Sequence, residues 1–195
     1  MTDTGTYSWR RIDVDDGLGL VSLSATGKGF VGEAVEVVSD RGEAWACRFT
    51  VQVTADWITE QARVEVIRGS GSRSRSLIHD LSGVWTVDKQ EIETPQGCLD
   101  IDIASTPFTN TLPIRRLNLE IGASREIDVV WVDVPNLGIE IVRQRYKRLT
   151  PENGSDRYLY ASVGSDSTYE LTVDSEGVVI DYERFAARLG SSRQP

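Results

Sequence analysis

The sequence predicts an all-β fold, a curved antiparallel sheet or barrel-like meander of about a dozen strands. Apolar and polar residues alternate with a period of two along much of the chain, as in strands that bury one face. Turn signals containing Gly, Asn, Asp or Pro separate these segments at spacings of roughly 10 to 15 residues. Connections this short join antiparallel strands rather than parallel ones.

The alternation identifies individual strands along the chain. It is clearest in residues 45–53, 62–67, 117–121 and 169–174. Residues 127–134 are apolar on both faces at their centre, which indicates a strand covered on both sides, as in the middle of a barrel wall or beneath a lid. Residues 183–189 alone are predicted as a helix, and this helix is short.

An internal repeat is also present. Residues 77–84 and 171–178 share the pattern L-x-x-D-x-x-G-V at an offset of 94 residues, which is close to half of the chain. The pattern indicates either an internal duplication or a chance match between two hairpins. Residues 1–189 are expected to form a single β domain, and the polar tail 190–195 is expected to be disordered.

Composition narrows the possible functions. The chain has 195 residues, with 30 acidic and 21 basic side chains and a net charge of −9. This charge disfavours binding to nucleic acids. Apolar runs are too short to span a membrane, and the N-terminus lacks the features of a secretory signal, so a cytoplasmic location is expected. In that compartment, Cys47 and Cys98 are expected to be small buried side chains rather than a disulfide or a metal site.

Few residues suit catalysis or a cofactor. The single histidine, His79, argues against a multi-histidine metal site and against a Ser-His-Asp triad. His79 is interpreted as a polar surface residue, with a haem ligand as the alternative. No Gly-rich phosphate loop is present in the sequence. We therefore expect no cofactor and no metal, and we favour a binding protein over an enzyme.

Two carboxylates lie on the same face of a strand predicted for residues 98–103. Asp100 and Asp102 are two positions apart, which places them roughly 6 to 7 Å from each other. Such a pair could act as a general acid and base, although glycosidase carboxylates flank the reacting bond from opposite sides. The alternative is that the pair anchors an arginine or turn amides.

Two adjacent arginines follow a turn rich in Thr, Asn and Pro. Arg115 lies on the apolar face of the strand predicted for residues 113–121, and Arg116 lies on its polar face. An arginine on an apolar face must be paired, and a carboxylate of the preceding strand is the expected partner of Arg115. Arg115 is therefore either part of a core ion pair or a contact for a ligand head group. Asn110 is expected to cap the turn, with a sugar contact as the alternative.

The same block resembles the hallmark of a known family. Residues 98–117, which contain C-x-D-x-D and TPFTNTLPIRRL, are similar to the bacterial proteins described as putative glycolipid-binding proteins. The similarity extends more loosely to Gln144-x-Tyr146, to Tyr158-x-Tyr160 and to residues 173–182. A Tyr-Pro dipeptide is expected after Asp near the end of the domain, and here the proline is replaced by Glu183.

The resemblance implies a curved antiparallel sheet with an apolar interior, similar in shape to periplasmic lipoprotein carriers, and a lipid or glycolipid ligand. Our leading hypothesis is a non-catalytic protein that holds an apolar tail in the concavity of the sheet, with the head group near polar side chains. Aromatic residues could stack on sugars or acyl chains, although each could equally fill the core. The candidate ligand-binding residues are Asp100, Asp102, Asn110, Arg115, Arg116, Trp131, Tyr146 and Tyr160.

Two other functions stay open at this point. One is a carbohydrate-active enzyme that uses Asp100 and Asp102. The other is an interaction module whose interior is filled by its own side chains. The sequence leaves the oligomeric state and the identity of the ligand undetermined.

Overall fold

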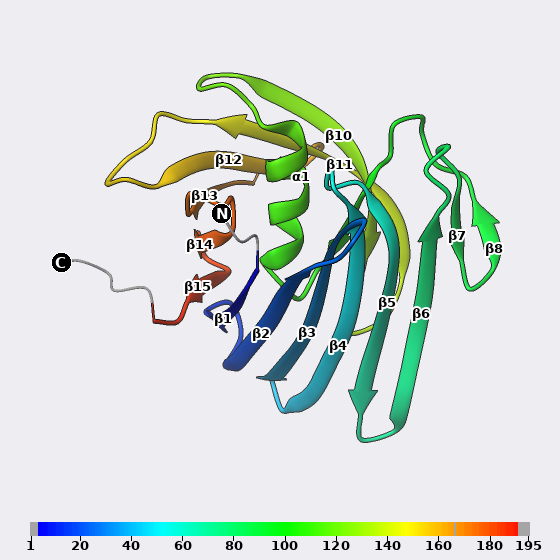
Figure 1. The fold of residues 1–195 in the computed structure, drawn as a ribbon. Helices are drawn as coiled ribbons and strands as arrows, with labels where there is room; N and C mark the ends of the chain where they lie inside the picture. Colours follow the sequence, from blue (N-terminus) through cyan, green and yellow to red (C-terminus); the bar gives the residue numbers. More distant parts are fainter. Residues whose placement is uncertain (1–3, 166, 191–195) are drawn as a thin grey trace.

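The computed structural model describes residues 4–165 and 167–190. This part of the chain forms 15 strands in one sheet and one short helical segment (Figure 1). The strands are β1 (Gly5–Arg11), β2 (Asp16–Ala25), β3 (Gly29–Asp40), β4 (Glu43–Thr54), β5 (Thr59–Arg68), β6 (Gly71–His79), β7 (Trp85–Val87), β8 (Gln90–Ile92), β9 (Asp100–Ile103), β10 (Ser124–Val132), β11 (Ile139–Arg148), β12 (Asp156–Ser162), β13 (Thr168–Val173), β14 (Val179–Tyr182) and β15 (Ala186–Arg188). The helical segment comprises the 3-10 turn η1 (Phe108–Asn110) and the α-helix α1 (Thr111–Leu117). The predicted all-β class is confirmed.

The sheet is continuous and curved but does not close into a barrel. Its order runs from β8 down to β1, continues through β15 and ends at β9, so β8 and β9 are its two edges. Neighbouring strands are antiparallel except β9 and β10, which are parallel because η1 and α1 form the crossover between them. Among the described residues, no helix has the length and apolar character needed to cross a membrane.

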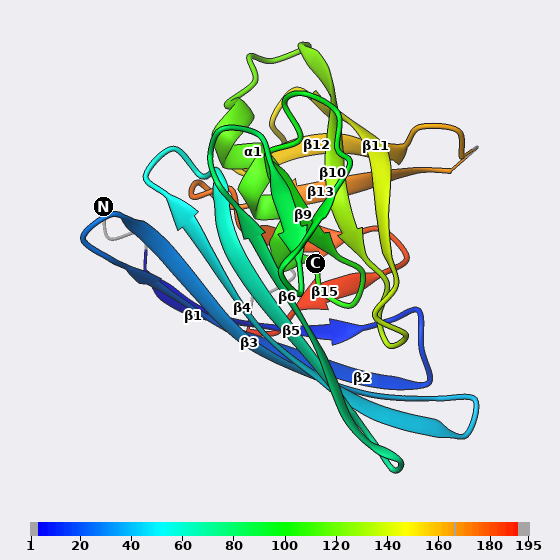
Figure 2. The same ribbon diagram turned by 90° about the vertical axis from the view of Figure 1, so that its right-hand side faces the viewer.

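The β9 edge lies inside the curve of the first half of the sheet (Figure 2). The amide N–H of Thr59, at the start of β5, donates to the carbonyl of Leu99 at 3.1 Å. β10 is covered on both faces, because Val129 belongs to one buried cluster and Val130 to the other. This confirms the strand that was expected to be covered on both sides. The concave face of β2–β7 is therefore packed against β9, β10 and α1.

Close packing brings the helical segment onto the sheet. Phe108 of η1 lies directly over Gly32 of β3, where a Cβ atom would come within 2.6 Å of the Phe108 ring. Leu112 of α1 joins the same buried cluster as Val64 and Leu77. A larger side chain at position 32 would push the helical segment away from β3.

The strand predicted for residues 113–121 is wrong, because residues 111–117 form α1 and residues 118–121 form a loop. Pro113 lies in the first turn, where a helix requires no backbone N–H donor. Asn118 ends the helix in the left-handed conformation, with φ 39°, and its N–H donates to the carbonyl of Ile114 at 3.2 Å. Arg115 and Arg116 occupy the last turn, where the helix dipole favours positive charge.

The helix predicted for residues 183–189 is also wrong. Arg184 adopts a φ of 61°, which interrupts any helix at that point. The chain then forms β15, which pairs with β1 on one side and β14 on the other. The tail predicted to be disordered lies outside the described residues except for Gly190.

Both cysteines are free and buried, as predicted. The surface position predicted for His79 is wrong. His79 lies two positions after Leu77 along β6, so the two side chains point to the same, concave face of the sheet. Its ring stacks on Trp85 with centroids 4.9 Å apart, and its Nδ1 lies 3.0 Å from the carbonyl oxygen of Thr59.

The two repeated segments form matching turns. In one, Asp80 Oδ1 accepts the amide N–H of Val84 at 2.9 Å, and in the other Asp174 Oδ1 accepts the amide N–H of Val178 at 2.9 Å. Shifting the strands β3 to β7 by 94 residues places each of them over β10 to β14 in turn. The same shift places β1 over β9 and β2 over α1. The correspondence of whole elements supports an internal duplication in which a helix occupies the position of the second strand.

Candidate functional site

Asp102 links three elements. Its Oδ1 accepts a hydrogen bond from the Thr109 hydroxyl at 2.8 Å, and its Oδ2 accepts one from Nε2 of Gln144 at 2.6 Å. Thr109 Oγ1 in turn accepts the amide N–H of Ile103 at 3.2 Å. Burial raises the pKa of Asp102, and the two side-chain hydrogen bonds oppose this shift by stabilising the charged form. The carboxylate fastens η1 and β11 to β9.

Asp100 pairs with Arg116. Nε and Nη2 of Arg116 donate to the two carboxylate oxygens of Asp100 at 3.1 and 2.5 Å. The pairing predicted for Arg115 is wrong, because on a helix the neighbouring arginine is the one directed at β9. Burial raises the pKa of Asp100, while the guanidinium of Arg116 opposes the shift. The bidentate geometry fixes the side of α1 that faces β9.

The environment of Asp100 does not suit acid–base chemistry on a bound sugar. The Asp100 side chain is 0% exposed, and both oxygens are engaged by Arg116. A catalytic carboxyl has to reach the atom that it protonates or attacks. The carboxylate pair therefore acts here as an anchor for the helical segment.

Three further candidates form a buried polar and aromatic group behind α1. The Tyr146 hydroxyl donates to Asn110 Oδ1 at 3.0 Å and lies 3.2 Å from Gln144 Oε1. The rings of Tyr146 and Tyr160 are 5.3 Å apart. All of these side chains are buried, and burial raises the pKa of both tyrosines. The group holds η1 against β11 and β12.

Trp131 lies next to this group. It is half-buried on β10, directly opposite Asp102 on the parallel neighbour β9 and opposite Glu140 on β11. Its ring packs against the buried cluster that includes Tyr146. Of the eight predicted site residues, the structure thus gathers seven around the contact of α1 with β9–β12, and Arg115 points elsewhere.

Arg115 lines a cavity of about 340 Å³ on the other side of α1, which we call the Arg115 cavity. Its guanidinium carbon lies 4.1 Å from the ring centroid of Trp57, in the geometry of a cation–π interaction. The other face of Trp57 stacks on Phe30, with centroids 4.4 Å apart and an interplanar angle of 16°. The cavity is lined by Trp57, Ile114, Arg115, Asn118, Arg148, Asp156, Tyr158, Ser175, Glu176 and Gly177.

The backbone at Trp57 is unusual. Its φ of 64° is rare for a bulky residue and costs free energy that the surrounding contacts have to offset. The turn is held by Thr54 Oγ1, which accepts the amide N–H groups of Asp56 and Ile58, each at 3.2 Å. Strained positions of this kind concentrate at ligand sites. Here the strain places the indole between Arg115 and Phe30.

The polar wall of the Arg115 cavity is ordered by a bidentate ion pair. Nη2 of Arg148 lies 2.9 Å from each carboxylate oxygen of Asp156, and Nη1 donates to the carbonyl of Leu119 at 2.8 Å. Asn118 and Glu176 complete the wall. Carboxylates, an amide and guanidinium groups beside an aromatic ring can donate to and accept from the hydroxyls of a sugar.

A second cavity is lined by Phe30, the stacking partner of Trp57, and we call it the Phe30 cavity. It has a volume of about 410 Å³. Its lining comprises Thr26, Gly27, Lys28, Phe30, Val31, Gln52, Val53 and Glu60. Phe30, Val31 and Val53 contribute the apolar part of its lining, and the charged ends of Lys28 and Glu60 can remain in water.

Arg116 lines a different cavity, of about 560 Å³, together with Arg125 and Arg143. Asp128 also lines this cavity, and its two carboxylate oxygens accept hydrogen bonds from Nε and Nη2 of Arg143 at 2.9 and 3.0 Å. The two neighbouring arginines of α1 thus serve different sites. Within residues 4–165 and 167–190, no group of three His, Cys, Asp or Glu side chains is arranged to hold a metal ion.

Sequence reasoning missed Trp57, Phe30, Arg148 and Asp156 as site residues. Trp57 occurs in the turn T-A-D-W, where a large aromatic residue is an atypical turn component, and this was the available signal. Phe30, Arg148 and Asp156 line the cavities only because strands distant in sequence pair in the sheet.

Comparisons with known proteins identify the family. A crystal structure of a DUF1089 family protein from Pseudomonas aeruginosa is 34% identical, covers 88% of this chain and 92% of its own, and has a TM-score of 0.76. A β-barrel-like protein of the domain of unknown function DUF1849 from Brucella abortus is 10% identical, covers 95% of this chain and 93% of its own, and has a TM-score of 0.56, which shows a similar fold alone. No curated protein matches the sequence. The family model described as "Putative glycolipid-binding" matches residues 6–188, and the chain therefore belongs to this family.

Proposed function

We propose that this protein binds a glycolipid without chemical turnover, with the sugar in the Arg115 cavity and the apolar tail in the Phe30 cavity. The observation that carries the proposal is the stack of Arg115, Trp57 and Phe30, in which Arg115 and Trp57 line a polar cavity and Phe30 lines an apolar one. A ligand with one polar and one apolar end can occupy both cavities by crossing this stack. The description of the family points to the same class of ligand.

The polar end of the ligand would contact side chains that already have fixed positions. The pair formed by Arg148 and Asp156 presents donors and acceptors in a set geometry. Arg115 is held over the indole of Trp57, so that little side-chain entropy is lost when its N–H groups meet hydroxyl oxygens. Such preorganisation favours binding because less ordering is required.

The apolar end would gain free energy from burial. Each methylene removed from water contributes about 0.8 kcal/mol. The Phe30 cavity, at about 410 Å³, lies within the range of roughly 300 to 1,000 Å³ that is usual for small-molecule sites. Since β9, β10 and α1 pack against the concave face of β2–β7, this proposal places the tail at the rim of the concavity.

The remaining predicted residues act indirectly in this proposal. Asp100 and Arg116 fix the rotation of α1, and Asp102 and Asn110 fix the start of the helical segment. These contacts determine where Arg115 emerges. They would position the head-group site rather than touch the ligand.

A titration followed by NMR tests the proposal. ¹⁵N-labelled protein is titrated with dodecyl maltoside below its critical micelle concentration, and in parallel with maltose. Both ligands are expected to shift the amide signals of Trp57, Asn118 and Gly177 in a saturable manner. Only the detergent is expected to shift those of Gly27 and Phe30. Absence of saturable shifts at both cavities would contradict the proposal.

A pair of matched variants sharpens the test. Arg115→Gln removes the charge over Trp57 and is expected to weaken detergent binding by about tenfold, the effect of one charged hydrogen bond. Arg145→Gln makes the same change at an exposed arginine that pairs with Glu126 on the surface of β11. The affinity of the Arg145→Gln variant for the detergent should match that of the unmodified protein. Equal losses in the two variants would show that the effect is one of net charge.

A further inference from the structure

We propose that the cavity between the β5–β6 turn and the β10–β11 loop is a second binding site, for a phosphate-class anion. This cavity has a volume of about 180 Å³. Its lining comprises Val66, Arg68, Ser70, Gly71, Ser72, Arg73, Pro135 and Asn136. The proposal is independent of the glycolipid site, which involves none of these residues.

The charge of this cavity is opposite to that of the protein. The chain has a net charge of −9, yet the lining contributes two arginines and no carboxylate. Among the described residues, no Asp or Glu oxygen forms an ion pair with Arg68 or Arg73. Arg75, two positions further along β6, shows the contrast, because Nη1 lies 2.8 Å from Asp88. The two cavity arginines therefore lack the neutralising partner that most arginines of this protein have.

One N–H donor of Arg68 has no hydrogen-bond acceptor among the described residues. Its Nη2 donates to Asn136 Oδ1 at 3.3 Å, which holds the guanidinium against the β10–β11 loop. Its Nε is buried and has no hydrogen-bond partner in the described part of the chain. A buried charged donor without an acceptor is costly, because it has lost water and gained nothing in exchange. An anion in the cavity would compensate the positive charge of this guanidinium.

The other donors suit a tetrahedral oxyanion. The hydroxyls of Ser70 and Ser72 can rotate to donate to phosphate oxygens. Gly71, the first residue of β6, has a φ of 116°, a backbone conformation that L side chains rarely adopt, so this lining position carries no side chain. Arginine and serine donors together form a common recognition set for phosphate.

The size of the cavity selects among anions. At about 180 Å³ it is smaller than the roughly 300 Å³ at which sites for whole small molecules begin. It can accept a single phosphate or sulfate group, either free or at the end of a larger molecule that stays outside. Val66 closes one side with an apolar wall and is itself buried.

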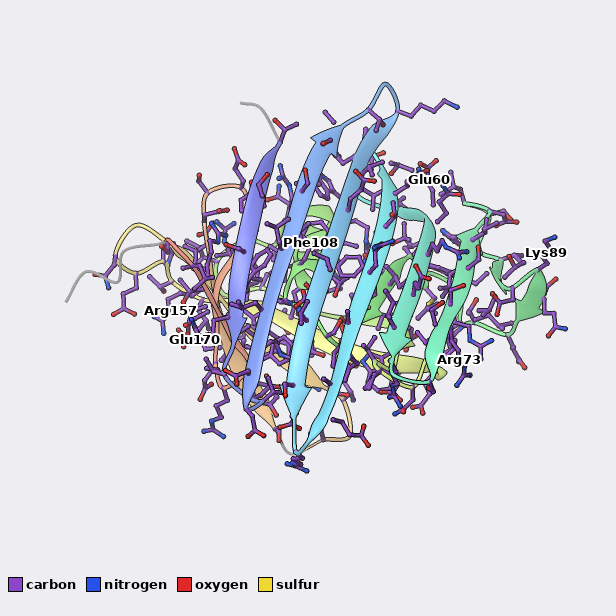
Figure 3. All side chains as sticks on the ribbon, turned by 90° about the horizontal axis from the view of Figure 1, so that it is seen from below. Glu60, Arg73, Lys89, Phe108, Arg157 and Glu170 are labelled. Atoms are coloured by element: carbon purple, nitrogen blue, oxygen red, sulfur yellow. The ribbon has the colours of Figure 1, made fainter. Side chains whose placement is uncertain are left out.

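The anion site lies far from the Phe30 cavity. Figure 3 shows Arg73 near the β5–β6 turn and Glu60, which lines the Phe30 cavity, at the opposite end of the same strands. Eight residues of β5 separate Glu60 from Arg68, a span of about 26 Å at the usual strand rise. A phosphate at one site and the apolar tail of a ligand at the other would therefore be recognised separately.

Titration with inorganic phosphate tests the proposal. Amide signals of residues 68–73 and of Asn136 are expected to shift in a saturable manner at constant ionic strength. Arg73→Gln and Arg68→Gln are each expected to weaken binding by about tenfold. Arg63→Gln, which removes an exposed arginine on the convex face of β5, should leave the affinity unchanged. Because Arg73 is exposed, its substitution is not expected to affect folding.

A second experiment determines whether the anion is a lipid phosphate or a soluble phosphate. Vesicles of phosphatidylcholine containing phosphatidic acid are compared with vesicles of phosphatidylcholine alone in a sedimentation assay. Binding that requires phosphatidic acid and is lost in Arg73→Gln identifies a lipid phosphate. Saturable binding of inorganic phosphate without vesicle binding identifies a free phosphate or a soluble phosphate ester. The proposal is overturned if phosphate causes no saturable shift, or if Arg63→Gln weakens binding as much as the two cavity variants.

Discussion

The two halves of the sheet share one order of elements and differ in a single place. The strands β3 to β7 match β10 to β14 at an offset of 94 residues, whereas α1 stands where the first half has β2. With a strand in that place, β1, β2 and β3 form an antiparallel meander. With a helix there, β9 pairs with β10 in parallel and the helix is free to cover the sheet. The helix α1, in the position that β2 has in the first half, thus allows the second half of the sheet to form a candidate binding site.

The difference also separates two kinds of core. Apolar side chains dominate the contact between the first half and the β9–β10 edge. Around α1, by contrast, Asp100, Asp102, Asn110 and Gln144 form a buried polar network with specific partners. Such networks add directional restraints that apolar packing lacks. The predicted consequences are largest where this network is broken.

Asp100→Asn is expected to have the largest effect on stability. The substitution keeps the shape of the side chain but leaves the largely buried guanidinium of Arg116, whose side chain is 15% exposed, without its carboxylate. Breaking a buried pair in this way costs about 3–5 kcal/mol. Urea unfolding followed by tryptophan fluorescence measures the loss. Asp128→Asn on neighbouring β10, which breaks the exposed pair with Arg143, is the control and should barely move the urea midpoint.

Glu36 provides a test in the first half of the molecule. This side chain on β3 is 1% exposed, and burial raises its pKa from 4.5 to about 7. The folded state therefore holds this proton more tightly than the unfolded state does. The resulting stability is fully present below pH 4.5 and is lost as the pH rises to about 7, by about 3 kcal/mol in total.

Glu36→Gln should remove that pH dependence. At pH 8 the variant is expected to be more stable than the unmodified protein, while at pH 4 the two should be similar. Thermal unfolding in a series of buffers measures the difference. A Glu36→Gln protein that keeps the full loss of stability between pH 4.5 and 7 would assign that loss to other groups.

The matched turns offer a smaller and more direct comparison of the halves. Asp174 accepts backbone amides as Asp80 does, and its Oδ2 also lies 2.8 Å from Nη1 of Arg188 on β15. Asp174→Ala is therefore expected to cost about 1–2 kcal/mol. Asp80→Ala removes only the turn contacts and should lower the melting temperature less. The reverse order would show that the contact with Arg188 adds nothing.

The strands could be predicted from sequence because a strand with one buried face has apolar and polar residues in alternation. The helix could not be predicted in this way, because the alternation L-x-L-x-I at residues 117–121, which begins where α1 ends, was extended back over residues 113–116. Pro113 in the first turn and Asn118 at the end of α1 were the available helix signals, and they carry more information than that alternation. Residues 183–189 gave the opposite error, since pairing with β1 and β14 overrides a local helical pattern.

The candidate site was predictable only in part. A carboxylate–arginine pair was predicted, and it exists, but choosing Arg116 over Arg115 depends on knowing that the segment is a helix. The position of Trp57 between Arg115 and Phe30 depends on the pairing of strands and on a backbone with φ 64°. No local pattern of apolar and polar residues encodes either feature.

The most direct test of the glycolipid proposal is to measure intermolecular nuclear Overhauser effects between the protein and dodecyl maltoside below its critical micelle concentration. If the glycolipid site is as proposed, the alkyl chain contacts the Phe30 ring and the sugar protons contact Trp57. The convex face offers exposed Leu18 and Val37, which a detergent could contact without any specific site. Alkyl contacts confined to those two side chains, with none at Phe30, would contradict the proposed site.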